Sequence, residues 1–367
     1  MNAPYRPRRP AELLSGTLFL DLGGDHRDTI LVAGSGRSGT TWLSELINRE
    51  NEYRFIFEPF HPGKVAPCEP FLRKQYLRPE DDRAIYLEAA GKILSGKIRS
   101  RWADRFNRKL LARRRLIKDI RANLLLGWTR RHFPETPIIL LLRHPCAVAD
   151  SRLRLGWRDN LDEVMSQRQL VEDHLEPLEA DILAAKDPFE RSIFLWCIEN
   201  YIPLRQPGSE KLHIVFYENL LTDPESELAS IFDFLRERPP EFRSADPPSI
   251  RRLAPPRTPG ALYEDDPEER LRTEDAPSEG GSRIPGSEPR SEPKNPADRL
   301  RTGGYSPGGE SETPDSPPGS EAWRISGWTE RVDAARRKRA VEIMGLFGLD
   351  RIYGEDPMPR PEGVLEP

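Results

Sequence analysis

The sequence predicts a three-layer α/β fold in which a central, mainly parallel sheet is flanked by helices. Short apolar runs alternate with stretches of helical periodicity over residues 29–237. Such alternation is typical of βαβ units, because parallel neighbours need a crossover connection. The clearest buried strands are TILVAG at 29–34 and PIILLL at 137–142, and a glycine-rich loop follows the first of them directly.

Five strands and the helices between them follow from this apolar pattern. The expected strands are TILVAG (29–34), FIFEPF (55–60), RLIKDI (115–120), PIILLL (137–142) and HIVFY (213–217). The expected helices are 40–50, 79–114, 123–133, one that begins near Pro145, 189–205 and 222–235. Ligands of parallel sheets bind beyond the carboxyl ends of the strands, so functional side chains are expected there. The residues at these ends are Gly34–Gly39, Glu58, Lys118 and Arg143.

Composition divides the chain into a core, a long polar segment and two short ends. Of the 367 residues, 32% are charged and 37 are prolines, which is too polar for a chain that is globular throughout. Residues 238–320 are rich in Pro, Gly, Ser, Glu and Arg and have little to bury, so we expect a disordered insertion. The expected parts are a loose arm at 1–28, the core at 29–237, this insertion, a C-terminal part at 321–353 with an amphipathic helix at 329–347, and a tail at 354–367.

Charge and cysteine content narrow the compartment and the partners. The formal net charge of −4 implies neither a nucleic-acid nor a membrane partner, and no apolar stretch reaches the roughly 18 residues of a membrane span. Cys68, Cys146 and Cys197 show neither disulfide nor metal-ligand spacing, which predicts a reducing, cytoplasmic location and no metal site. Residues 97–121 hold eleven Lys or Arg and two acids, which favours either an anionic acceptor or a solvated helix face.

The stretch GSGRSGTTW at 34–42 fits two phosphate-binding patterns. Its three glycines spell G-x-G-x-x-G, and Gly39 with Thr40-Thr41 also completes a P-loop in which Thr replaces the usual Lys. A glycine loop between a strand and a helix presents backbone N–H groups and a helix N-terminus to an anion. The alternative is a plain Gly/Ser turn.

Neither pattern is complete. Glu58 lies about 20 residues after the glycines, where a dinucleotide fold places an acid for the ribose. However, Arg37 adds a cation inside the loop that NAD recognition does not require. A kinase would need the missing Lys and a magnesium-binding Asp after an apolar strand, which the sequence does not show.

A second motif, LLLRHPCAVADSR at 140–152, decides between these interpretations of the glycine loop. Arg143 ends a buried strand, and Ser151 follows eight residues later in the expected helix. Arg offers a planar, permanently charged fork to phosphate oxygens, and Ser adds a hydroxyl donor. The alternative is that Arg143 pairs with a carboxylate and Ser151 faces solvent. Together the two motifs predict a nucleotide with phosphate-like groups at both ends.

These residues resemble the PAPS-dependent sulfotransferase family, in the style of its bacterial and carbohydrate-type members. GSGRSGTTWL is similar to the family's 5′-phosphosulfate loop, with Arg37 where Lys or Arg stands, and LLLRHPCAVADSR is similar to its 3′-phosphate motif. The resemblance covers about 29–237 and 321–353. It implies a P-loop-like fold, 3′-phosphoadenosine 5′-phosphosulfate (PAPS) as co-substrate, no metal, and transfer of a sulfuryl group to an acceptor hydroxyl.

The resemblance also implies the roles of individual residues. Those expected to bind the cofactor are Gly34, Ser35, Gly36, Arg37, Ser38, Gly39, Thr40, Thr41, Trp42, Arg143 and Ser151. Arg37 and Lys118 are expected to act on the sulfuryl group; the alternative for Lys118 is an ordinary surface residue. Glu58 is the first candidate base, because heparan-type members carry a Glu at similar spacing, and His61 is the second.

Pro59 and Phe60 are expected to desolvate Glu58 and raise its pKa. The alternative is a structural ion pair between Glu58 and Arg37 or Lys118. The expected acceptor is an alcohol of a carbohydrate or small metabolite, with an anionic glycan as one candidate. Two other functions stay open: a nucleotide-binding enzyme of NAD-dependent or kinase type, and a non-catalytic interaction protein on the same fold.

Overall fold

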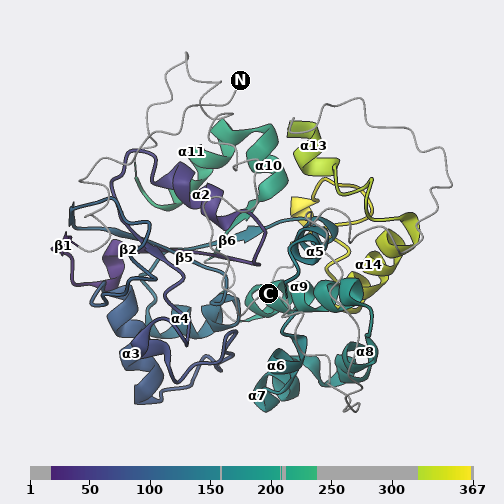
Figure 1. Cartoon of the computed structure of the whole chain (residues 1–367), viewed down its shortest axis with the longest axis horizontal. Coiled ribbons are helices and arrows are strands. Elements are labelled where there is room, and N and C mark those ends of the chain that lie inside the picture. The colour runs from purple at the N-terminus through teal and green to yellow at the C-terminus, as the bar shows by residue number, and fades with distance from the viewer. Residues whose placement is uncertain (1–17, 158, 207, 209–211, 238–320, 365–367) are drawn as a thin grey trace, which may run out of the picture.

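A computed structural model of the chain describes residues 18–157, 159–206, 208, 212–237 and 321–364. Its centre is a parallel five-stranded sheet in the order β3-β5-β2-β6-β7 (Figure 1). The strands are β2 (Thr29–Gly34), β3 (Arg54–Phe57), β5 (Arg115–Asp119), β6 (Ile138–Leu142) and β7 (Leu212–Phe216). The predicted α/β fold class is therefore confirmed, and all five predicted strands are present.

Helices cover both faces of this sheet. They are α2 (Thr40–Ile47), α3 (Ala84–Leu94), α4 (Leu126–His132), α5 (Pro145–Arg154), α6 (Leu161–Met165), α7 (Arg168–Leu170), α8 (Glu179–Ala184), α9 (Pro188–Arg205), α10 (Tyr217–Thr222), α11 (Pro224–Phe234), α13 (Glu321–Ser326) and α14 (Ala334–Leu346). Figure 1 shows α2, α10 and α11 on one side of the sheet and α3, α4 and α9 on the other.

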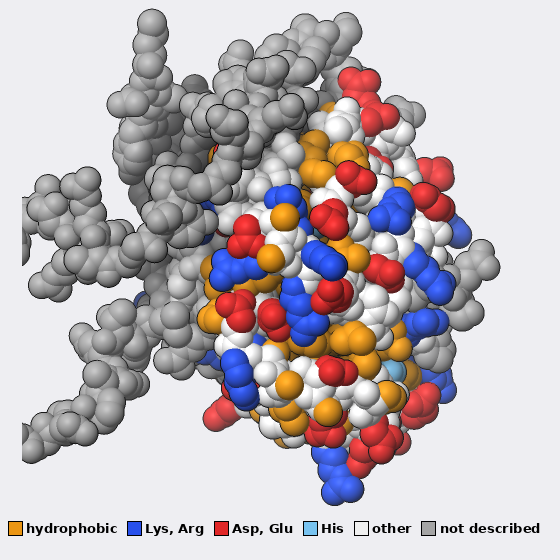
Figure 2. All heavy atoms as spheres, turned by 90° about the vertical axis from the view of Figure 1, so that its right-hand side faces the viewer, with side chains coloured by type: hydrophobic (Ala, Val, Ile, Leu, Met, Phe, Trp, Pro, Cys, Tyr) orange, Lys and Arg blue, Asp and Glu red, His pale blue; other side chains and the backbone are white. Residues whose placement is uncertain are grey.

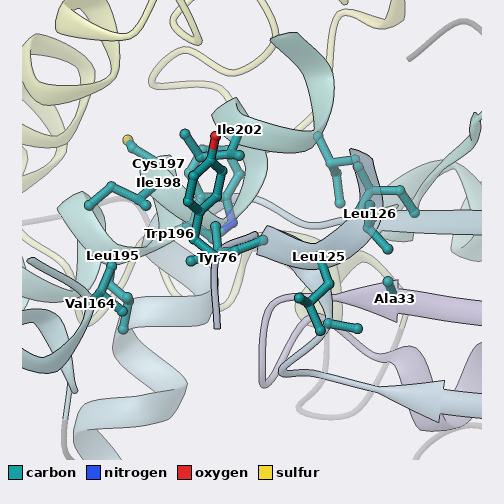
Figure 3. Packing of buried hydrophobic residues seen from close by; sticks show 14 of the residues in the cluster. Ala33, Tyr76, Leu125, Leu126, Val164, Leu195, Trp196, Cys197, Ile198 and Ile202 are labelled. Atoms are coloured by element: carbon teal, nitrogen blue, oxygen red, sulfur yellow. The ribbon is translucent and has the colours of Figure 1, made fainter. Parts of the chain in front are cut away.

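The strand side chains alternate between the two layers, as a sheet buried on both faces requires. On β2, Ile30 and Val32 pack toward α2 and α11, whereas Leu31 and Ala33 belong to the larger core on the opposite face. Figure 3 shows part of that larger core, where α9 contributes Trp196.

The C-terminal part returns to this core after the residues that the structure does not describe. Phe347, just after α14, packs edge-on against Phe194 and Tyr201 of α9, with ring centroids 6.3 and 5.5 Å apart. Figure 2 shows the surface on the right-hand side of Figure 1, where acidic and basic side chains are interspersed. Ion pairs such as Arg339 with Glu190 at 3.3 Å join α14 to α9 there.

The predicted helix at 79–114 is wrong over most of its length. Only α3 is helical, and turns and the short strand β4 (Leu111–Ala112) replace the rest. Gly96 adopts a left-handed φ of 70° just after α3 and its carbonyl accepts a hydrogen bond from buried Arg54. Asp104 also binds Arg54, at 2.8 Å. Tertiary ion pairing therefore overrides the helical propensity of this segment.

Several elements had no sequence prediction. These are the helices α6, α7, α8 and α10 and a second, two-stranded sheet in which β1 (Leu20–Asp21) pairs in parallel with β4. The predicted insertion at 238–320 and residues 1–17 of the predicted arm lie outside the described residues. Within the described residues, no helix is both long enough and apolar enough to cross a bilayer.

Candidate active site

The sheet register brings the predicted site residues to one edge. Ala33 on β2 is opposite Asp119 of β5, and Gly34 is opposite Leu141 of β6. Phe57, which precedes Glu58, is opposite Lys118. The glycine loop, the acid after β3, the lysine of β5 and the arginine after β6 therefore meet at the carboxyl ends of neighbouring strands.

The three glycines of the loop are required by close packing. A Cβ atom at Gly34 would lie 2.6 Å from the carbonyl oxygen of Leu141, and one at Gly36 would lie 2.7 Å from the ring of Trp157. Gly39 has a left-handed φ of 102°, and a Cβ there would lie 2.7 Å from the ring of Tyr217. The loop backbone, which leads into α2, is thus packed tightly against β6, Trp157 and Tyr217.

Unpartnered donors beside this loop fit a bound anion. In the described part of the chain, Ser38 Oγ, Arg143 Nε and Trp157 Nε1 are buried and have no hydrogen-bond partner. Leaving a buried polar group unpaired costs about 1–3 kcal/mol, so a ligand that accepts from these donors would be stabilised by them. Phosphate or sulfate oxygens are acceptors of this kind.

The two sequence motifs contact each other directly. Arg37 Nε donates to Ser151 Oγ at 3.1 Å, and Arg143 donates from one guanidinium nitrogen to the carbonyl of Arg37 at 3.1 Å. Arg143 also lies over the ring of Tyr217, 4.1 Å from its centroid. Ser151 is only 9% exposed. The alternative in which Ser151 faces solvent is therefore wrong.

Glu58 is a buried carboxylate held between two cations. One oxygen accepts from Lys118 and the other from Arg121, and both cations are themselves buried. Burial raises the pKa of Glu58, but Lys118 and Arg121 outweigh it and bring the pKa from 4.5 to about 2. The prediction of a raised pKa is therefore wrong, because Pro59 and Phe60 are not the dominant neighbours. The alternative pairing of Glu58 with Lys118 is present, and Lys118 is not a surface residue.

Sequence reasoning missed Arg121 and Asp119, which hold the two strand ends together. The carboxylate of Asp119 accepts from the backbone N–H groups of Phe60, at 2.8 Å, and Arg121, at 2.7 Å. Burial and the nearby charge of Glu58 raise the pKa of Asp119 to about 6. The run KDIR at 118–121 carried the signal, because polar residues that end a buried strand mark the ligand edge of a parallel sheet.

The second candidate base and the two tryptophans occupy distinct places. His61 is buried, accepts from the backbone N–H of Gly63 at 3.1 Å and lies edge-on to Trp102. Trp102 donates to the backbone carbonyl of Glu58 at 3.2 Å and so belongs to the same corner of the site. Trp157 instead packs on the glycine loop, near Arg37.

A buried ion cluster beneath the loop was also not predicted. Arg152 donates to the carbonyl of Gly36 at 3.2 Å and to Glu199 at 2.8 Å, and Lys74 reaches Glu199 at 2.6 Å. Burial raises the pKa of Glu199, but Arg152 and Lys74 lower it to about 2. This cluster fixes the underside of the loop to α9.

Comparison with known proteins identifies the family of this chain. A sequence model of the sulfotransferase family matches residues 29–240, so this chain belongs to the sulfotransferase family. The predicted family resemblance is confirmed, while the bacterial and carbohydrate-type subdivision stays a prediction. A search of the curated proteins gives no match.

Solved sulfotransferase structures are similar at low identity. The sulfotransferase domain from the curacin biosynthetic pathway is 19% identical, over 60% of this chain and 76% of that one, with a TM-score of 0.33. The sulfotransferase from Alicyclobacillus acidocaldarius is 15% identical, over 61% and 87%, with a TM-score of 0.32. A mouse sulfotransferase complexed with PAP is 17% identical, over 66% and 68%, with a TM-score of 0.32.

Proposed function

We propose that this chain transfers a sulfuryl group from PAPS to a hydroxyl of an acceptor alcohol. The observation that carries the proposal is the direct contact between the loop and the second motif, through Arg37, Ser151 and Arg143. Two anion-binding elements that meet in this way suit a nucleotide phosphorylated at both ends of its ribose.

The residues that would hold the donor divide into two groups. The backbone of the loop, Ser38 Oγ and the N-terminus of α2 would hold the 5′-phosphosulfate, and Thr40, Thr41 and Trp42 belong to this same helix end. Arg143 and Ser151 would hold the 3′-phosphate, with the unpartnered Nε of Arg143 as a donor. PAPS supplies a sulfuryl group on a phosphate leaving group, and the chain supplies position and charge.

Charge stabilisation at the reacting centre falls to Lys118, Arg121 and Arg37. Lys118 and Arg121 carry two positive charges beside the carboxylate of Glu58, and Arg37 adds a third cation from the loop. In a buried site such fixed charges act strongly on charge that develops during the reaction. We infer that Lys118 turns from Glu58 toward the sulfuryl oxygens when the donor binds.

That movement also explains how Glu58 acts as the base. With a pKa of about 2 it is ionised at neutral pH and has no proton, so it can accept the acceptor's proton, but weakly. Sharing Lys118 with the donor would weaken the attraction that lowers the pKa of Glu58 and so strengthen the base. His61 remains the second candidate, since it also lies in this corner of the site.

The same geometry disfavours the two nucleotide-enzyme alternatives. Both carboxylate oxygens of Glu58 bind cations, so they do not present a free acceptor to a ribose hydroxyl. A P-loop kinase needs a Lys for the terminal phosphates, and Thr40 stands at that position of the loop. We propose a metal-independent reaction in the cytoplasm. We also propose that residues 29–237 and 321–353 form the catalytic core.

The acceptor is proposed to be a carbohydrate or small-metabolite alcohol, with an anionic glycan as a candidate. Exposed cations in the basic segment, such as Arg101 and Arg108, support an acidic acceptor. The proposal is tested with PAPS carrying labelled sulfur and a panel of phenols, alcohols and glycans. Wild type should transfer the label to at least one acceptor without added magnesium. The variant Lys118→Met should transfer no label to that acceptor. Labelling that requires ATP and magnesium instead of PAPS would overturn it.

A further inference from the structure

The two-stranded sheet presents an exposed leucine face. This leucine face consists of Leu18, Leu20, Leu22 and Leu111, which are 62, 55, 50 and 55% exposed. It contains four of the eleven large hydrophobic side chains that are exposed in the described part of the chain. Single exposed leucines are ordinary, but a cluster of this kind marks an interaction surface.

Buried ion pairs fix the strand that carries this face. The side chains of β1 alternate, so that Asp21 points inward and accepts hydrogen bonds from Arg54 and Arg115, each at 2.9 Å. Phe19 is buried beneath the guanidinium groups of Arg54 and Arg99. The inward side of β1 is thus fully engaged, and the leucines on its other side are held outward on a rigid support.

Cations flank the leucine face on both sides. Arg99 donates to the carbonyl of Phe19 at 2.9 Å, which places the exposed segment of Lys97 and Arg99 beside β1. On the other side, Arg113 is exposed and follows Leu111 by two residues, so it shares the outer face of β4.

The acids near this face are already engaged. Asp104 is buried against Arg54, and Asp21 is turned inward to the same arginine. Asp25, beyond the end of β1, lies 3.7 Å from Arg27. The leucine face therefore combines apolar area with unopposed positive charge, in contrast to the mixed charges of the face in Figure 2.

We propose that the leucine face is a docking surface for an anionic lipid bilayer. Peripheral membrane binding combines apolar side chains at the headgroup boundary with Lys and Arg that attract anionic lipids. A protein partner would favour aromatic side chains and hydrogen-bonding groups, and the leucine face has neither. This proposal is independent of the proposed sulfuryl transfer.

The test is sedimentation of the full chain with phosphatidylcholine vesicles, with and without phosphatidylserine. Wild type should sediment with the anionic vesicles and be released by high salt, because salt screens the charges. Leu20→Ser with Leu111→Ser should lower the partition coefficient roughly tenfold for each leucine. Lys97→Gln and Arg113→Gln should lower it about fivefold each.

Matched controls are Leu183→Ser, whose leucine is 48% exposed on α8, and Lys338→Gln, an exposed lysine on α14. These should sediment as wild type does, and all variants should keep the wild-type thermal midpoint. Equal binding to both kinds of vesicle, or anionic binding that the leucine variants do not change, would overturn the proposal. A third outcome would also overturn it. If wild type binds no vesicles but forms a dimer in analytical ultracentrifugation, and Leu20→Ser with Leu111→Ser abolishes that dimer, the leucine face binds a second copy of the chain.

Discussion

Replacing Lys118 by Met tests whether this buried cation, together with Arg121, lowers the pKa of Glu58. Burial raises the pKa of Glu58, but Lys118 and Arg121 lower it from 4.5 to about 2. One pKa unit is about 1.4 kcal/mol, so the shift corresponds to about 3 kcal/mol of stability at neutral pH. Because the folded-state pKa is the lower one, this contribution is present above pH 4.5 and is lost as the pH falls toward about 2.

In Lys118→Met, the carboxylate keeps Arg121 but loses the cation on its other oxygen, so its pKa rises. Breaking a buried ion pair costs about 3–5 kcal/mol, and we expect the thermal midpoint at pH 7 to fall by roughly 10 °C. The difference in unfolding free energy between wild type and Lys118→Met should be smaller at pH 4 than at pH 7 by about 1 kcal/mol or more. At pH 4 wild type has lost part of the stability that ionised Glu58 contributes, whereas the carboxyl of Glu58 in the variant becomes uncharged.

The assay is thermal unfolding of both proteins at pH 7 and pH 4. Lys92→Met is the matched control, since Lys92 is an exposed lysine on α3 and should change the midpoint little at either pH. Adding Glu58→Gln to Lys118→Met should recover part of the lost stability, because the buried charge is removed. A difference that stays constant between the two pH values would refute the reasoning that Lys118 sets the pKa of Glu58.

Three further predictions concern the loop and the reacting groups. Arg37→Ala should lower kcat more than it weakens PAP binding, whereas Arg143→Ala should mainly weaken PAP binding by calorimetry; equal effects would contradict the division of roles. Glu58→Gln should keep PAP binding and lose about 10²–10⁴ in transfer rate, and a fully active variant would move the base elsewhere. Gly39→Ala should destabilise the fold by about 2 kcal/mol or more in urea unfolding, because of its left-handed φ of 102° and the nearby Tyr217 ring. Gly24→Ala, whose Cβ would meet no atom within 4 Å, is its control and should be neutral.

Elements with a strong local signal could be predicted from the sequence. The runs TILVAG and PIILLL are apolar apart from Thr29, and they correspond to β2 and β6, which are buried on both faces. The Pro145 that was expected early in a helix stands at the first position of α5. The strand ends then fixed which residues would gather, because parallel neighbours end at one edge.

The remaining parts depend on contacts between distant residues. Arg54 and Arg115 are fully buried, and only tertiary pairing with Asp21 and Asp104 makes that possible. The basic run at 97–121 is therefore not one solvated helix, because Arg115 is buried against Asp21 whereas Arg101, Arg108 and Arg113 are exposed. The pKa of Glu58 was mispredicted for the same reason, because Arg121 lies 63 residues along the chain yet contacts it.

The central claim is that the loop and the second motif hold a nucleotide with phosphates at the 3′ and 5′ positions. Its most direct test compares adenosine 3′,5′-bisphosphate (PAP) with AMP in thermal unfolding, without metal and at matched concentrations. A ligand at about 100 times its Kd stabilises the native state by roughly 2.7 kcal/mol, which is a midpoint shift of several degrees.

AMP lacks the 3′-phosphate, and each charge-assisted hydrogen bond lost with that group costs about 1.5–3 kcal/mol. PAP should therefore raise the midpoint of wild type clearly more than AMP does, and Arg143→Ala should remove that advantage. Magnesium should not change either shift. A PAP shift no larger than that of AMP, or an advantage of PAP that survives Arg143→Ala, would contradict the assignment of the two motifs.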